Sequence, residues 1–83
     1  MHKLKYIRFE TRLADSVFLF PNWENHANVA QRLGYQPVSA GFVSIWVDED
    51  HNLQVQTHGR SESLNMESDP QDADLIHAML KTV

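Results

Sequence analysis

The segment from residue 57 to residue 75 holds the side chains best suited to bind a ligand. It reads THGRSESLNMESDPQDADL, with Arg60 followed closely by Ser61 and Ser63. A guanidinium is a planar fork of donors that pairs with carboxylates and phosphates, and serine hydroxyls beside it can donate or accept. These residue types predict a polar recognition patch for an acidic partner or an anion. The alternative is structural: Arg60 pairs with a nearby acid, and the serines face solvent.

Four more side chains complete the candidate binding residues. His26 lies on or beside the apolar stripe of a predicted helix, where either a hydrogen-bonded structural histidine or a pocket residue is expected. Ser39 begins a run of small residues that allows a close approach of backbone or ligand. Phe42 and Trp46 share one face of a predicted strand. If the helices cover the opposite face, we expect this aromatic pair at a dimer or partner interface.

The same stretches do not support a catalytic or metal site. Residues 59–63 begin like the G-x-S-x-G turn of hydrolases, but the final glycine is missing, and a strand is expected where that motif needs a helix. Residues 48–52 alternate oxygen ligands like an EF-hand, yet Leu53 and Gly59 stand where that loop requires Gly and Glu. The five histidines lack H-x-x-x-H or H-E-x-x-H spacing. We expect a non-enzymatic protein without metal or other cofactor.

Composition is that of a small, acidic, folded chain. Its 83 residues are 42% hydrophobic and include no cysteine, which predicts one domain over residues 1–83 stabilised by its apolar core. Residues 1–12 contain four basic side chains and one acid, a sum of +3, and residues 48–74 contain eight acids and one base, a sum of −7. The acidic balance argues against a nucleic-acid partner, and the lack of a long apolar run argues against a membrane segment. We expect a soluble, cytoplasmic protein.

Hydrophobic periodicity and helix caps predict the elements that position these residues. Alternating or clustered apolar residues indicate strands. The predicted strands lie near residues 4–9, 17–20, 41–47, 53–57 and 61–66. A helix is predicted over 23–33, capped by Asn22, ended by Gly34 and with Trp23 in the core. A second helix is predicted over 70–81, capped by Asp69.

The resulting order, β-β-α-β-β-β-α, predicts an α+β fold. Each predicted helix has one apolar stripe, and the strands have one strongly apolar face. The simplest packing is a two-layer sandwich in which an antiparallel sheet of about 4–5 strands carries both helices on one face.

Short polar motifs over roughly the C-terminal two thirds resemble a family of small uncharacterised proteins of phages, prophages and bacteria. The motifs are SAGFV from Ser39, GRSESL from Gly59, and Ser68-Asp69-Pro70 with Asp72-Ala73, and His26 fits the same pattern. The resemblance implies no particular activity. It implies that the protein is an accessory protein that binds a partner protein rather than a catalyst, and a homodimer is one form this contact could take. The alternative is a small-ligand or anion-binding module that uses Arg60 and the neighbouring serines.

Overall fold

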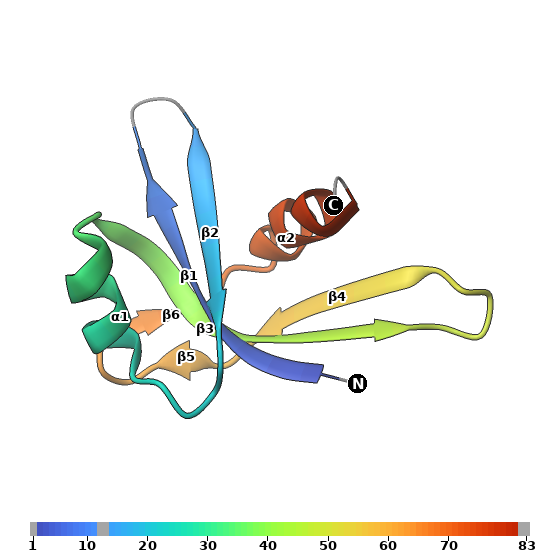
Figure 1. The fold of residues 1–83 in the computed structure, drawn as a ribbon, viewed down its shortest axis with the longest axis horizontal. Helices are drawn as coiled ribbons and strands as arrows, with labels where there is room; N and C mark the ends of the chain where they lie inside the picture. The colour runs from blue at the N-terminus through green and yellow to red at the C-terminus, as the bar shows by residue number, and fades with distance from the viewer. Residues whose placement is uncertain (1, 12–13, 82–83) are drawn as a thin grey trace.

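The computed structural model describes residues 2–11 and 14–81 (Figure 1). In chain order its elements are β1 (His2–Glu10), β2 (Asp15–Phe20), α1 (His26–Leu33), β3 (Pro37–Val47), β4 (Leu53–His58), β5 (Arg60–Ser61), β6 (Met66–Glu67) and α2 (Asp72–Lys81). The predicted α+β class is confirmed, although the order is β-β-α-β-β-β-β-α. Neither helix has the length and hydropathy needed to cross a bilayer, as far as the described residues go.

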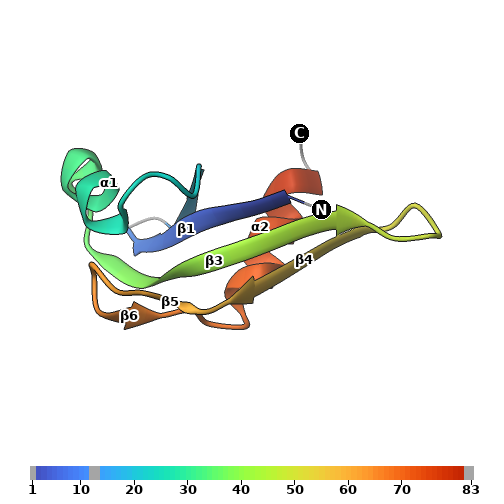
Figure 2. The same ribbon diagram turned by 90° about the horizontal axis from the view of Figure 1, so that it is seen from below.

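Four strands form one antiparallel sheet in the order β2-β1-β3-β4. β1 pairs with a strand on each side. Its Lys5 lies opposite Phe20 of β2 and opposite Phe42 of β3. Phe42 in turn lies opposite His58 of β4. The long β3–β4 hairpin projects beyond the rest of the molecule (Figure 2).

β5 and β6 form a separate small hairpin rather than the single strand predicted near 61–66. The chain reverses after Ser61, whose Oγ accepts a hydrogen bond of 3.2 Å from the backbone N–H of Leu64. Asn65 follows with φ 53, a left-handed conformation that asparagine tolerates better than most residues. The segment near 61–66, whose weak alternation predicted one strand, therefore forms a turn flanked by two short strands.

The two helices pack on opposite faces of the sheet, so the prediction that both lie on one face is wrong. Successive residues of a strand point to opposite faces. Ile7 of β1 belongs to a core cluster with Val29 of α1, whereas the adjacent Tyr6 belongs to a second cluster with Ile76 of α2. β1 thus carries bulky side chains on both faces, and each face needs its own helix to exclude water. Figure 1 shows the helices at separate places around the sheet.

α1 begins later than predicted because Asn25, not Asn22, is its N-cap. Asn25 has extended backbone angles, and its side-chain oxygen accepts from the backbone N–H of Asn28 at 3.1 Å. Trp23 therefore lies before the helix and is 78% exposed, so its predicted place in the core is wrong. The predicted C-cap is confirmed: Gly34 has φ 76, and its N–H donates to the carbonyl of Ala30.

α2 begins close to its predicted start. Asp69 precedes Pro70, and its Oδ1 accepts from the backbone N–H of Gln71 at 2.9 Å. The carbonyl of Asp69 also accepts from the N–H of Asp72 at 2.9 Å. Asp69 therefore caps the helix as predicted, and the next acid, Asp72, enters the interior instead of facing solvent.

Candidate functional site

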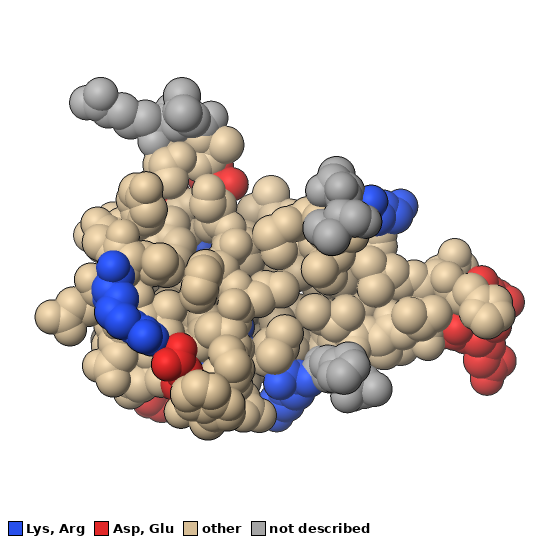
Figure 3. Space-filling view, in the orientation of Figure 1, with Lys and Arg blue, Asp and Glu red and all other residues tan. Residues whose placement is uncertain are grey.

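Three acidic side chains lie together at one end of the molecule. Figure 3 shows acidic atoms gathered at the tip of the projecting β3–β4 hairpin, which residues 48–50 form. Asp48 there organises the loop, since its Oδ1 accepts from the N–H groups of Asp50 and Asn52, each at 2.9 Å. These hydrogen bonds lower the pKa of Asp48. The tip of this hairpin thus accounts for three of the eleven acidic residues of the chain.

Four predicted binding residues meet at one pocket, which we call the basic pocket. Its volume is about 330 Å³, and β1, α1, β3, β5 and the turn after β5 contribute to it. It is lined by Lys5, Asn25, His26, Phe42, Arg60, Glu62 and Ser63. The sequence predicted His26, Phe42, Arg60 and Ser63 as binding residues, but it did not predict Lys5, which a strand brings in from far along the chain.

Arg60 has one buried donor without an acceptor. Its Nη2 donates to Asn65 Oδ1 at 2.6 Å, but its Nε is buried and has no hydrogen-bond partner. Glu62 Oε1 lies 3.6 Å from Nε, a distance that suits an ion pair and is too long for a hydrogen bond. The Glu62 side chain is 87% exposed and is free to move away. An incoming oxygen could therefore take the Nε–H of Arg60.

Lys5 adds a second positive charge that is held in place. Its Nζ donates to the carbonyl of Glu24 at 2.7 Å. The same ammonium lies 6.0 Å from the ring centroid of Phe42, and that of Lys3 lies 5.3 Å from it. Phe42 therefore forms an aromatic surface beneath two cations, at a distance where the ring quadrupole attracts them.

His26 lines the basic pocket and also joins α1 to β3. It is buried, and its Nε2 lies 2.9 Å from the carbonyl of Gly41. A carbonyl only accepts, so Nε2 carries the proton. Burial lowers the pKa of His26, the charge of Lys5 lowers it further, and the bond to Gly41 opposes this. The ring is therefore neutral near pH 7, contacts the rings of Phe20 and Phe42 edge-on, and adds no charge to the pocket.

The two serines beside Arg60 have different roles. Ser63 is exposed, and its Oγ accepts from the backbone N–H of Ala27 at 3.0 Å, which leaves its own hydroxyl proton to donate. Ser61 is fully buried, and its hydroxyl is used by the turn to Leu64. Ser63 therefore belongs to the basic pocket, whereas Ser61 supports the hairpin that presents Arg60.

Trp46 lies outside the pocket, on the same face of β3 as Phe42. It is partly buried opposite Gln54 of β4. Phe42 is also partly buried, with the ring of His58 stacked at 6.0 Å and 17°. Neither aromatic residue is fully exposed, and their role at an interface stays a prediction.

Ser39 belongs to a buried polar group on the other face of the sheet, which we call the Asp72 cluster. Asp72 is 1% exposed, and its Oδ2 accepts from Tyr6 at 2.6 Å and from Ser39 at 2.5 Å. Its Oδ1 lies 2.7 Å from Nε of Arg8 but receives no well-aligned hydrogen bond, because that N–H donates to Ser39 Oγ at 3.1 Å. The cluster joins β1, β3 and α2.

Hydrogen bonds and an ion pair within the Asp72 cluster hold α2 against β1 and β3, so the cluster has a structural role. Burial and the hydrogen bond to Asp72 raise the pKa of Tyr6, which keeps its phenol protonated as a donor. Arg8 also contacts Asp15 at 2.9 Å, at the surface end of the cluster. The sequence did not predict this group, because an acid in the first turn of a helix, such as Asp72, is usually solvated. Its partners Ser39 and Tyr6 also lie 33 and 66 residues away.

Comparisons with protein-family models, with curated proteins and with solved structures found no match for this chain. The resemblance to phage and bacterial proteins therefore stays a prediction. Within residues 2–11 and 14–81, no group of three or more histidine or acidic side chains is placed to hold a metal ion.

Proposed function

We propose that this is a non-catalytic binding protein that holds an acidic group of a partner protein in the basic pocket. The observation that carries the proposal is the buried Nε of Arg60, a charged donor without an acceptor. Arg60 and Lys5 line the same pocket. A buried donor left unpaired costs about 1–3 kcal/mol, which a carboxylate in the pocket would relieve.

Glu62 supports the proposal because it occupies the place that a partner carboxylate would take. Its Oε1 is the carboxylate oxygen 3.6 Å from Arg60 Nε, on an almost fully exposed side chain. Exposed ion pairs contribute only roughly 0–1 kcal/mol, so displacement of Glu62 costs little. Ser63 can then donate its hydroxyl proton to the second oxygen of the incoming group.

A partner protein fits this pocket better than a free anion. A small anion gains little beyond its contacts with the two cations, and association itself costs several kcal/mol. A protein that brings an acidic side chain would also cover the surface beside the pocket, where Phe42 and Lys3 lie together. Its additional contact area supplies the affinity that one carboxylate lacks.

Titration of the ¹⁵N-labelled protein with a capped tetraglutamate peptide tests the proposal. We expect saturable shifts of the Arg60 and Ser63 amides, no shifts with tetraglutamine, and loss of binding in Arg60→Ala. Arg32→Ala is the matched control, because Arg32 is an exposed arginine paired with Glu24 outside the basic pocket. Equal binding by wild type and Arg60→Ala would refute the proposal. Acetate binding as tight as that of the peptide would favour the small-anion alternative instead.

A further inference from the structure

Trp23 is the most exposed of the large hydrophobic side chains in the described part of the chain, at 78%. A turn causes this exposure: the N–H of Glu24 donates to the carbonyl of Pro21 at 3.1 Å, so Trp23 lies before α1 and points away from the core. Tryptophan is highly buried in most proteins, and single exposed apolar residues need no explanation by themselves. The surroundings of this indole are what indicate a ligand.

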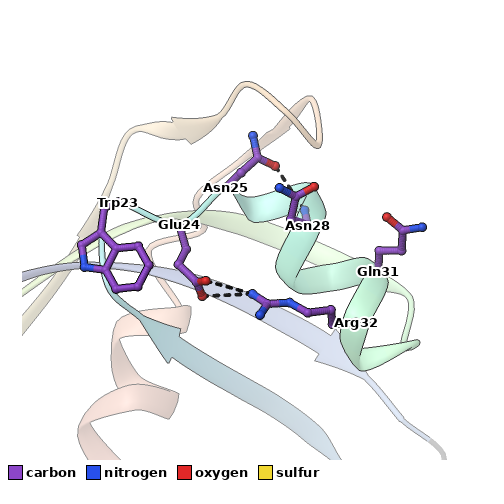
Figure 4. Close-up of a pocket in the computed structure, with 6 residues that line it drawn as sticks. All are labelled: Trp23, Glu24, Asn25, Asn28, Gln31 and Arg32. Atoms are coloured by element: carbon purple, nitrogen blue, oxygen red, sulfur yellow. Dashed lines mark hydrogen bonds and ion pairs between the residues drawn. The ribbon is translucent and has the colours of Figure 1, made fainter.

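The indole forms one wall of a groove of about 530 Å³, which we call the Trp23 groove (Figure 4). The other walls come from the residue after Trp23, from the cap of α1 and from the outer side of that helix. The groove is lined by Trp23, Glu24, Asn25, Asn28, Gln31 and Arg32. Its size falls in the range of about 300–1,000 Å³ typical of small-ligand sites.

The polar groups of the Trp23 groove are of mixed kind, and two of them, Glu24 and Arg32, hold each other in place. Arg32 Nη2 lies 3.1 and 3.0 Å from the two carboxylate oxygens of Glu24, and Figure 4 shows this pair beside the indole. Among the described residues, the side-chain amides of Asn28 and Gln31 have no hydrogen-bond partner. One short stretch of surface thus offers a flat apolar ring, a carboxylate, a guanidinium and two free amides.

We propose that the Trp23 groove binds a carbohydrate. A pyranose ring has a face of C–H groups that packs flat on an aromatic ring, and a rim of hydroxyls that each donate and accept. Trp23 would receive the C–H face. Asn28, Gln31 and the Glu24–Arg32 pair would bond the hydroxyls, with acceptors and donors available on the same side.

Other ligand classes fit the groove less well. A tryptophan that anchors a protein interface sits among apolar neighbours that exclude water, but every other residue lining this groove is polar. A polyanion would need free cations, and the one cation here is already paired with Glu24. A neutral ligand rich in hydroxyls is the class that uses both the indole and the amides.

The indole N–H signals of the two tryptophans provide the test. We would titrate the ¹⁵N-labelled protein with cellobiose, maltose and N,N′-diacetylchitobiose, using sorbitol as a polyol without a pyranose face. We expect at least one disaccharide to shift the Trp23 signal saturably, while Trp46 and the sorbitol titration stay unchanged. Trp23→Ala should bind about ten-fold more weakly or worse, in line with the loss of an aromatic contact.

The controls separate a sugar site from other causes. Trp23→Ala should fold normally because its side chain is mostly in solvent, and Phe18→Ala, which removes a different exposed aromatic ring, should bind like wild type. Gln31→Ala should weaken binding without abolishing it. Absence of a Trp23 shift with all three disaccharides would overturn the proposal, as would equal binding by Trp23→Ala. A Trp23 signal that moves with protein concentration alone would also overturn it, because the groove would then be a contact between copies of this chain.

Discussion

The phenol of Tyr6 on β1 donates a 2.6 Å hydrogen bond to the buried carboxylate of Asp72 on α2, and 66 residues separate the two. The same phenol oxygen accepts from the backbone N–H of Asp69 at 3.2 Å. A single buried side chain thus fixes both the cap and the first turn of α2 against the sheet. The C-terminal helix is held by polar contacts at its start and by apolar packing of Ile76 further along.

Asp72→Ala should destabilise the fold strongly. It removes the acceptor for Tyr6 and Ser39 and leaves Arg8 without its buried partner. Breaking a buried charge pair by deleting one partner costs about 3–5 kcal/mol. Asp74→Ala, an exposed acid in the same turn, should change stability by less than about 0.5 kcal/mol. Urea unfolding measures both variants, and equal losses would contradict a specific role for Asp72.

Stability should fall at alkaline pH because of Tyr6. Its pKa is raised in the folded state, so the phenol stays protonated there while it ionises in the unfolded chain above about pH 10. The unfolded state then binds fewer protons, and the free energy of unfolding decreases as pH rises past that value. Tyr6→Phe cannot ionise and should show a shallower decrease than wild type. If the urea midpoints of the two proteins fall equally steeply above about pH 10, this explanation is ruled out.

Stability should also fall at mildly acidic pH because of His26. Burial lowers its pKa in the folded state, so below about pH 6.5 the unfolded chain binds a proton that the folded chain does not. Stability from the neutral buried ring is present above this pH and is lost as pH falls toward the folded pKa. His26→Gln keeps a donor for Gly41 without titrating. Its stability should therefore change less than that of wild type from neutral pH to the folded pKa, as measured by urea unfolding.

The sequence predicted the elements better than their placement. Caps such as Gly34 and Asp69 act within a few residues, so their signals are local and were correct. Which face each helix covers depends on contacts between distant segments, such as Ile7 with Val29 and Tyr6 with Ile76. The apolar residues on both faces of β1 were a local sign of two covered faces.

The candidate site was predictable only where its residues are close together in the sequence. Arg60 and Ser63 are close in sequence and reach the same pocket, as their spacing suggested. Lys5 enters through strand pairing that sequence spacing does not reveal. Trp23 was misplaced because Asn22 and Asn25 are equally good caps by residue type, and only the turn before α1 selects Asn25.

Gly41 and Gly34 should tolerate asparagine very differently. A Cβ at Gly41 would lie 2.9 Å from the carbonyl oxygen of His58 and 2.9 Å from Cβ of Ser68. A Cβ at Gly34 would meet nothing within 4 Å, and the only obstacle is its φ of +76. Asparagine adopts that conformation readily, so Gly34→Asn should cost less than about 1 kcal/mol. Gly41→Asn should cost about 1–3 kcal/mol or more through the clash, and equal thermal shifts would contradict this difference.

Arg60→Ala should leave the fold nearly intact, whereas Arg8→Ala should destabilise it. The Arg60 side chain is 40% exposed, and its pair with Glu62 is a surface contact of the kind that contributes roughly 0–1 kcal/mol. Its removal also deletes a buried donor that lacks an acceptor, which offsets part of the loss. Arg8→Ala instead leaves the buried carboxylate of Asp72 without its charged partner and should cost about 3–5 kcal/mol. Urea unfolding compares the two variants directly. A loss of several kcal/mol for Arg60→Ala would show that its guanidinium is needed for folding, and the basic pocket would then lose its main support.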